Sequence, residues 1–181
     1  MTASSMDSIK QLASPAGRLR IAGTVNDSIV DGEGYRYTIF TQGCPHGCPG
    51  CHNPQTHDFA GGREADIREL LREALDNPIL AGVTFSGGEP FCQAAALVEL
   101  AGELHRHGLS VWCYSGYTYE QLTACGKPAV QALLRQLDVL VDGAYIEQQR
   151  DLTLSFRGSR NQRLIDVPAS LQQGTAVLYQ L

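Results

Sequence analysis

The stretch Gly43-Cys44-Pro45-His46-Gly47-Cys48-Pro49-Gly50-Cys51-His52-Asn53 holds three of the six cysteines of the chain, at a Cys-x3-Cys-x2-Cys spacing. Its glycines and prolines predict a loop rather than a helix or a strand. Such a loop can turn several thiolates toward one ion or cluster. Structural zinc sites and simple ferredoxin clusters are closed by four protein ligands. Three thiolates, from Cys44, Cys48 and Cys51, would instead leave one iron of a cubane open to a ligand from outside.

Three other interpretations of these cysteines stay open. A zinc knuckle could take His52 as a fourth ligand, but adjacent residues rarely point at the same ion. The run from Cys48 to His52 also matches the attachment pattern of c-type haem, which would leave Cys44 without a role. A redox-active dithiol of Cys48 and Cys51 would be expected at the start of a helix. The spacing favours an iron–sulfur site over all three.

The rest of the chain alternates between strand-like and helix-like patterns. Apolar residues recur at helical spacing in three stretches, which predicts helices over residues 67–75, 94–104 and 130–137. Thr118 and Gln121 fit a capping box at the start of a further short helix. Strands are predicted over residues 19–25, 35–40, 79–85, 109–114 and 139–141.

This alternation predicts an α/β fold made of parallel β/α units, with helices outside the sheet. Three or four units are too few for a closed eight-fold barrel, so an open partial (β/α) barrel is expected. In folds of this kind the chemistry lies at the carboxyl ends of the strands. The cysteine loop and the turns Ser86-Gly87-Gly88 and Tyr114-Ser115-Gly116 each follow a predicted strand. They are therefore expected to meet at one edge of the sheet.

Length and composition exclude several classes of protein. The 181 residues, 43% of them hydrophobic, can bury a core. We expect a loosely ordered segment over residues 1–18 and a single domain over 19–181. No apolar run is long enough to span a membrane, and the start lacks the pattern of a secretory signal. The net charge of −5 and the absence of a basic stripe argue against nucleic acid as a partner. A cytoplasmic location is expected, where clustered cysteines usually indicate metal or redox chemistry.

The cysteine loop together with Ser86-Gly87-Gly88-Glu89-Pro90 resembles the radical S-adenosylmethionine (SAM) superfamily. Within it, the chain is most similar to the activating proteins of anaerobic ribonucleoside-triphosphate reductase. Two further motifs carry this resemblance, Val141-Asp142-Gly143 and the stretch from Arg157 to Arg163. The match runs in order from about Val25 to Val167. It implies the open partial barrel and one [4Fe–4S] cluster on Cys44, Cys48 and Cys51, with SAM on the fourth iron.

The resemblance also implies where SAM would bind. The turn at Gly88, with Gly87 and Glu89 beside it, is expected to hold the methionine moiety, with the Glu89 carboxylate favouring the SAM ammonium group. Glycines there would let a ligand approach the backbone closely. The complete set of expected SAM contacts is Gly50, His52, Gly87, Gly88, Glu89, Tyr114, Ser115, Gly116 and Asp142. No side chain is assigned as a catalytic acid or base, and Tyr114 to Gly116 could equally be a plain turn.

The function that follows from the resemblance is reductive cleavage of SAM and formation of a glycyl radical on anaerobic ribonucleoside-triphosphate reductase. A low-potential donor such as flavodoxin would supply the electron. Two alternatives remain: a radical SAM enzyme acting on another glycyl-radical enzyme or a small molecule, and a zinc-binding module without turnover. Cys92, Cys113 and Cys125 show no ligand spacing. The stretch from Arg157 to Arg163 is expected to be polar and exposed, with no role assigned to its residues.

Overall fold

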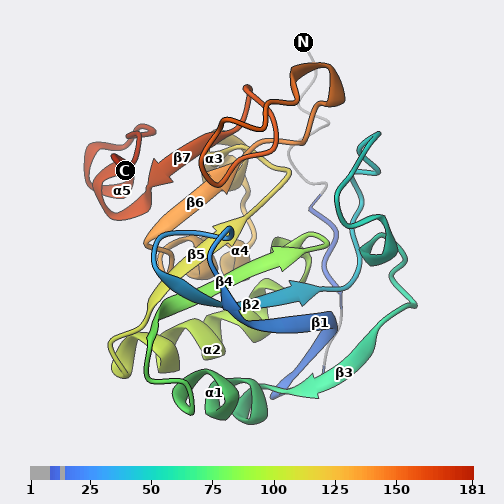
Figure 1. Ribbon diagram of the computed structural model, residues 1–181, viewed down its shortest axis with the longest axis vertical. Coiled ribbons are helices and arrows are strands. Elements are labelled where there is room, and N and C mark those ends of the chain that lie inside the picture. Colours follow the sequence, from blue (N-terminus) through green and yellow to red (C-terminus); the bar gives the residue numbers. More distant parts are fainter. Residues whose placement is uncertain (1–8, 13–14) are drawn as a thin grey trace.

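The protein, a computed structural model that describes residues 9–12 and 15–181, is built around a seven-stranded mixed sheet (Figure 1). The strands lie in the order β3-β1-β2-β4-β5-β6-β7. Their bounds are β1 Arg18–Ser28, β2 Tyr35–Thr41, β3 Arg63–Asp66, β4 Leu80–Gly87, β5 Ser110–Tyr114, β6 Val139–Asp142 and β7 Arg163–Asp166. The helices are α1 Ile67–Leu75, α2 Ala94–Arg106, α3 Tyr119–Ala124, α4 Pro128–Leu134 and α5 Val167–Gln173, with short 3-10 turns η2 Pro54–Thr56, η3 Pro90–Gln93 and η4 Glu147–Gln149.

Only the centre of the sheet is parallel. Strands β2, β4, β5 and β6 pair in parallel, as the β/α alternation predicts. The flanking pairs β1–β2, β1–β3 and β6–β7 are antiparallel, so the expectation of a wholly parallel sheet is wrong at both edges. Strands β3 and β7 were not predicted, because each begins and ends with a charged residue and holds at most two apolar residues. Helix α5 was not predicted either.

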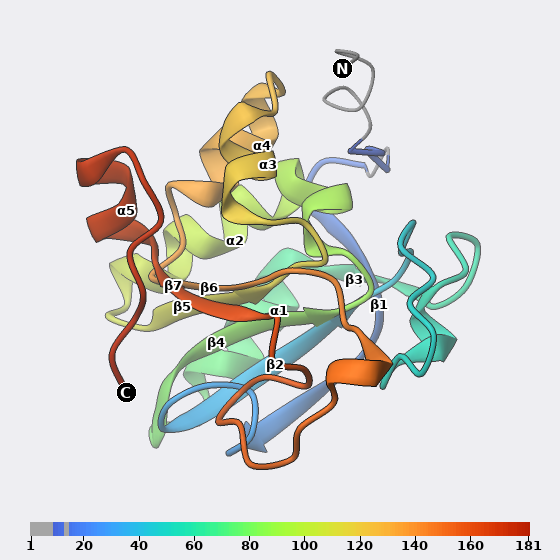
Figure 2. The same cartoon turned by 90° about the horizontal axis from the view of Figure 1, so that it is seen from above.

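The two faces of the sheet are covered differently. On one face, Tyr37, Phe85 and Cys113 belong to the main hydrophobic core, which also includes Leu70 of α1 and Leu97 of α2. Figure 2 shows α2 and α4 on this side and the segments that follow β1 and β6 on the other. Helix spacing of apolar residues predicted these helices, and the pattern is satisfied by this packing. The capping box of Thr118 and Gln121 is present at the start of α3, as predicted.

The opposite face carries a smaller cluster around Trp112, the single tryptophan of the chain. Its side chain is 2% exposed. Its ring lies 5.5 Å from that of Phe156, in the segment after β6, and 5.5 Å from that of Tyr179, near the C-terminus. The Tyr179 hydroxyl also donates to Glu33, which lies between β1 and β2. Three distant parts of the chain therefore meet at this ring.

The segment before β1 is partly fastened to the body of the protein. Ile9 is 3% exposed and belongs to the main core, and its carbonyl accepts a hydrogen bond from the Lys127 ammonium. The backbone N–H of Leu12 donates to the carbonyl of Cys92. Burial of an apolar side chain and these hydrogen bonds therefore hold residues 9–12 against the body of the protein, within the segment over residues 1–18 that was expected to be loose. Residues 1–8 and 13–14, which fall under the same expectation, lie outside the described part.

In the described part of the chain, no helix is both long and apolar enough to cross a membrane.

Candidate functional site

The cysteine loop, residues 43–53, leaves the sheet directly after β2. Figure 1 shows it in cyan, extending beyond the ends of the strands. Its base is closed by hydrogen bonds from Gly43 N to the Thr56 carbonyl (2.8 Å) and from Cys44 N to the His57 carbonyl (3.1 Å). Three glycines, at 43, 47 and 50, adopt positive φ, the region that glycine alone enters without strain. The loop prediction is confirmed, and its three cysteines are free thiols of intermediate exposure.

The surroundings of these thiols suit sulfur ligation. Burial raises the pKa of the Cys44 thiol to about 11, and burial also raises the pKa of Cys48. Hydrogen bonds from backbone N–H groups act in the opposite direction. Those of His46 and Gly47 lower the pKa of Cys44, and that of Tyr145 lowers the pKa of Cys48. The N–H of Asn53 lies 3.4 Å from the Cys51 sulfur. Hydrogen bonds to sulfur stabilise the thiolate and tune iron–sulfur clusters, so this donor set fits such a cluster. Binding would have to release the thiol protons.

The described residues include no group of three His, Cys, Asp or Glu side chains that could hold a single metal ion. A cubane does not require such a group, because each of its cysteine ligands binds a different iron. The remaining cysteines, Cys92, Cys113 and Cys125, are all buried. Cys113, at 0% exposure inside β5, packs as a small apolar side chain.

The Gly-Gly turn after β4 packs directly on the start of the cysteine loop. Gly88 N donates to the Thr41 carbonyl (2.8 Å), and Glu89 N donates to the Gly43 carbonyl (2.9 Å). A Cβ added to Gly88 would lie 2.6 Å from the Gly43 oxygen, and one added to Gly87 would lie 2.7 Å from the Phe40 Cα. The groups that approach these glycines closely are the backbone of the neighbouring strand and loop, and the expected close approach of a ligand stays a prediction.

The Glu89 side chain points into the protein. Its exposure is 0%, and its carboxylate accepts hydrogen bonds from the backbone of Phe91 (3.0 Å), the hydroxyl of Ser115 (3.0 and 3.1 Å) and the backbone of Gly116 (2.9 Å). The Nε2 atom of His46 lies 2.9 Å from the same carboxylate. Glu89, Ser115 and Gly116 were expected to meet, and they do. Their polar groups, however, are directed at one another, which differs from the expected contact between Glu89 and the SAM ammonium.

Asp142, at the end of β6, is also occupied by protein partners. It is 1% exposed and forms a two-point ion pair with Arg163, at 3.0 and 2.5 Å, while Tyr119 N donates to it at 2.7 Å. The same guanidinium contacts Glu120, and this hydrogen bond lowers the pKa of Glu120 to about 2. Asp142 therefore connects β6, β7 and α3. Because these partners occupy its carboxylate, the contacts do not support the direct contact with SAM that was expected of Asp142.

The two acidic partners of Arg163 give a matched pair of substitutions. Asp142→Asn should lower the free energy of unfolding by about 1–3 kcal/mol, because a buried charge-assisted pair is lost and an amide N–H faces a donor. Glu120→Gln should cost about 0–1 kcal/mol, since its side chain is 58% exposed and solvent screens the pair. Urea unfolding of the two variants measures the difference. Equal losses of unfolding free energy in the two variants would show that burial does not make the Asp142–Arg163 ion pair more stabilising than the exposed pair.

The stretch from Arg157 to Arg163 fastens the segment that follows β6. Asn161 Nδ2 donates to the Ala144 carbonyl (2.8 Å), and Gln162 Nε2 donates to the Gly143 carbonyl (3.0 Å). The Ser159 hydroxyl accepts from Ile146 N (3.2 Å) and is fully buried. The expectation that this stretch is exposed is therefore wrong for most of it: Ser159 is buried, and Arg160 is its one exposed residue. The polar side chains of the stretch from Arg157 to Arg163 form hydrogen bonds with the backbone of residues 143–146. These residues belong to no helix or strand, so their backbone groups need partners from elsewhere in the chain.

Residues 143–147, held in this way, lie against the cysteine loop. The rings of His52 and Tyr145 are 4.8 Å apart. A Cβ added to Gly50 would force the Glu147 carboxylate to move, and the positive φ of Gly50 favours glycine at this position. Gly50 and His52, both expected to contact SAM, are exposed, whereas Tyr114 donates its hydroxyl to the Phe156 carbonyl (2.8 Å). Tyr145 and Glu147 are more than 90 residues from the loop, and no local pattern pointed to them.

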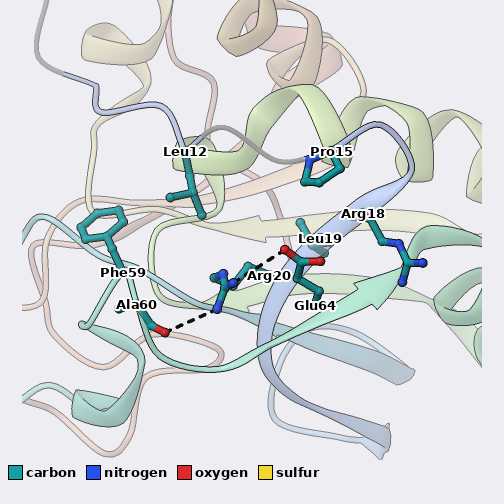
Figure 3. A pocket seen from close by; sticks show the side chains of 8 residues that line it. All are labelled: Leu12, Pro15, Arg18, Leu19, Arg20, Phe59, Ala60 and Glu64. Atoms are coloured by element: carbon teal, nitrogen blue, oxygen red, sulfur yellow. Dashed lines mark hydrogen bonds and ion pairs between the residues drawn. The ribbon is translucent and has the colours of Figure 1, made fainter.

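A cavity of about 350 Å³ lies beside β1 and β3 (Figure 3). It is lined by Leu12, Pro15, Arg18, Leu19, Arg20, Phe59, Ala60 and Glu64. Arg20 crosses it, with an ion pair to Glu64 at 3.7 Å and a hydrogen bond to the Ala60 carbonyl. No cysteine lines this cavity, so the candidate site is assigned from the thiols and not from the cavity.

Comparison with known proteins agrees with this assignment. A family model described as a 4Fe-4S single cluster domain matches residues 30–165. The chain is 34% identical to the anaerobic ribonucleoside-triphosphate reductase-activating protein of Vibrio cholerae and 32% identical to that of Escherichia coli K12, in each case over 142 residues. These alignments cover 74% of this chain and 89% and 90% of the relatives. The pyruvate formate-lyase-activating enzyme of Clostridium pasteurianum is 31% identical over 147 residues, which are 78% of this chain and 59% of that enzyme.

Proposed function

Since this chain belongs to the family of anaerobic ribonucleoside-triphosphate reductase-activating proteins, we propose that it is a radical SAM activase that generates a glycyl radical on that reductase. The observation that carries the proposal is the loop after β2, with three free thiols, backbone donors at the sulfurs and no fourth cysteine in the loop. Three protein ligands leave room on a [4Fe–4S] cluster for SAM. When bound, the two cofactors together supply a one-electron reductive cleavage of a carbon–sulfur bond.

The protein contributes position and shielding to this chemistry. Cys44, Cys48 and Cys51 would hold the cluster. For SAM, we propose contacts from the exposed Gly50 and His52 and from the backbone of Gly87 and Gly88.

Five further residues belong to the expected SAM set. Tyr114 and Gly116 lie at the same edge of the sheet and are partly exposed, so they complete the proposed contacts. Glu89, Ser115 and Asp142, whose polar groups are bound inside the protein, would support these segments without touching SAM.

The remaining parts of the proposal concern architecture and partners. We propose that the sheet with its outer helices is an open partial barrel of the radical SAM type, with residues 19–181 as one domain. An opening at the carboxyl edge would admit a polypeptide loop carrying the target glycine. The electron donor is proposed to be a low-potential protein such as flavodoxin. The location is proposed to be the cytosol, where free thiols stay reduced.

One experiment tests the activity directly. The anaerobically reconstituted protein is incubated with SAM, a reductant and the reductase, and a glycyl doublet is sought by electron paramagnetic resonance (EPR). We expect the doublet to form and to require SAM, with methionine released. A doublet on pyruvate formate-lyase but not on the reductase would assign the other partner that the Clostridium relative suggests. One zinc per chain and no sulfide after anaerobic purification would contradict the proposal and favour the binding module.

A further inference from the structure

The buried carboxylate of Glu89 is the meeting point of three loops. It lies in the turn after β4, it accepts two hydrogen bonds from the turn after β5, through Ser115 and Gly116, and it faces His46 of the cysteine loop. Both oxygens accept backbone N–H groups, from Phe91 and Gly116, and we assign the remaining hydrogen bond to donation from His46 Nε2. A fully buried carboxylate persists only when donors of this kind surround it.

The position of His46 is fixed by packing as well as by this hydrogen bond. Its ring makes an edge contact with Tyr117, at 4.5 Å between centroids. A Cβ on Gly116 would overlap the ring, which explains why a glycine follows Ser115. His46 lies between Cys44 and Cys48, and its backbone donates toward the Cys44 sulfur. The ring therefore connects the backbone that carries two of the thiols to the edge of the sheet at β5.

We propose that Glu89 and His46 are positioning residues, which hold the cysteine loop in register with the Ser115–Gly116 turn so that cluster and SAM meet in one geometry. This inference rests on the proposed function, because it assigns SAM to that edge of the sheet. On this proposal Glu89 does not contact SAM itself. Its carboxylate holds His46, and His46 in turn holds the cysteine loop. Loss of the link should loosen the loop without removing any cluster ligand.

Two substitutions of His46 separate the hydrogen bond from the space that the ring fills. His46→Met keeps a side chain of similar length without a donor, whereas His46→Gln keeps an N–H near the position of Nε2. His105→Met is the matched control. His105 also places Nε2 3.0 Å from a carboxylate, that of Asp138, but this pair lies at the opposite edge of the sheet, before β6.

Amide hydrogen exchange of the protein without cofactors tests the positioning itself. Residues 43–53 and 115–116 should exchange about tenfold faster in His46→Met, as expected for loss of one charge-assisted hydrogen bond, and within about threefold of wild type in His46→Gln. His105→Met should leave these segments unchanged. Unaltered exchange in His46→Met, or equal acceleration in both His46 variants, would overturn the proposal. This readout does not depend on SAM.

The second readout is the SAM-dependent change in the EPR spectrum of the reduced cluster. We expect His46→Met to bind iron and sulfide near wild-type levels. It should need about tenfold more SAM than wild type to reach half of the spectral change, and His46→Gln should restore most of the SAM affinity. A wild-type SAM dependence in His46→Met would refute a role in positioning and leave only a structural one. If wild type itself shows no change with SAM while the exchange results hold, the proposed function fails and the loop–carboxylate link stands.

Discussion

Single alanine substitutions of Cys44, Cys48 and Cys51 are each expected to abolish cluster binding and SAM cleavage. In the proposed cluster each thiolate would be the only protein ligand of its iron, so no neighbouring side chain could replace it. Iron and sulfide, about four of each per chain in the reconstituted wild type, should fall well below one. SAM cleavage should fall by more than about 100-fold, beyond the roughly 10–100-fold that loss of a supporting outer hydrogen bond costs. Metal analysis, absorbance near the cluster bands and deoxyadenosine release are the measurements.

The control for this series is Cys125→Ala. Cys125 is 2% exposed and lies in the main hydrophobic core at the end of α3, so its loss should cost about 1 kcal/mol of unfolding free energy and leave iron content unchanged. Full iron and undiminished deoxyadenosine release in any of the three loop variants would remove that residue from the ligand set. Loss of iron in Cys125→Ala would show that the series measures general destabilisation.

Gly88→Ala is expected to disrupt both folding and cluster assembly. The new methyl group would lie 2.6 Å from the Gly43 oxygen and 3.0 Å from the Thr41 oxygen, and backbone atoms cannot rotate away as a flexible side chain can. The turn and the cysteine loop must therefore separate. We expect a loss of about 1–3 kcal/mol of unfolding free energy, the usual cost of overpacking, and a fall in iron content, because Gly43 precedes Cys44, the first proposed cluster ligand. Thermal unfolding and iron analysis measure these effects.

Gly102→Ala provides the opposite expectation at another glycine. Gly102 lies inside α2, its φ is ordinary for a helix, and a Cβ there meets nothing within 4 Å. The substitution should stabilise the protein by about 0.5–1 kcal/mol, since alanine loses less conformational freedom than glycine in a helix. Iron content should not change. A Gly88→Ala protein as stable as wild type would contradict the close backbone packing described above.

Periodicity and loop chemistry predicted much of this molecule because both are local. Apolar spacing located α1, α2 and the central strands, and the cysteine spacing with its glycines located the loop and its three thiols. The edge strand β3 was missed because its sequence, Arg63-Glu64-Ala65-Asp66, is mostly polar and has no strand-like composition. Its structure comes from pairing with β1, a tertiary interaction that overrides local preference.

The partners of the acidic residues could not be predicted, because they are set by contacts between distant segments. Glu89 was expected to attract a cation, and its donors come from residues 46, 91, 115 and 116. Asp142 likewise pairs with Arg163, on the neighbouring strand. For both, the residue type indicated a need for a charge-assisted partner, and only the fold shows which partner satisfies it.

The packing around Trp112 gives the protein an intrinsic optical probe. All tryptophan fluorescence comes from this one ring, which contacts Phe156 on the segment that reaches the cysteine loop and Tyr179 near the C-terminus. A shift of emission to longer wavelength therefore signals that water has entered between β5 and one of these two segments. Replacing Tyr179 or Phe156 by leucine in turn would show which of the two segments causes the shift. Movements of the segment after β6, which reaches the cysteine loop, can therefore be followed in solution without any attached dye.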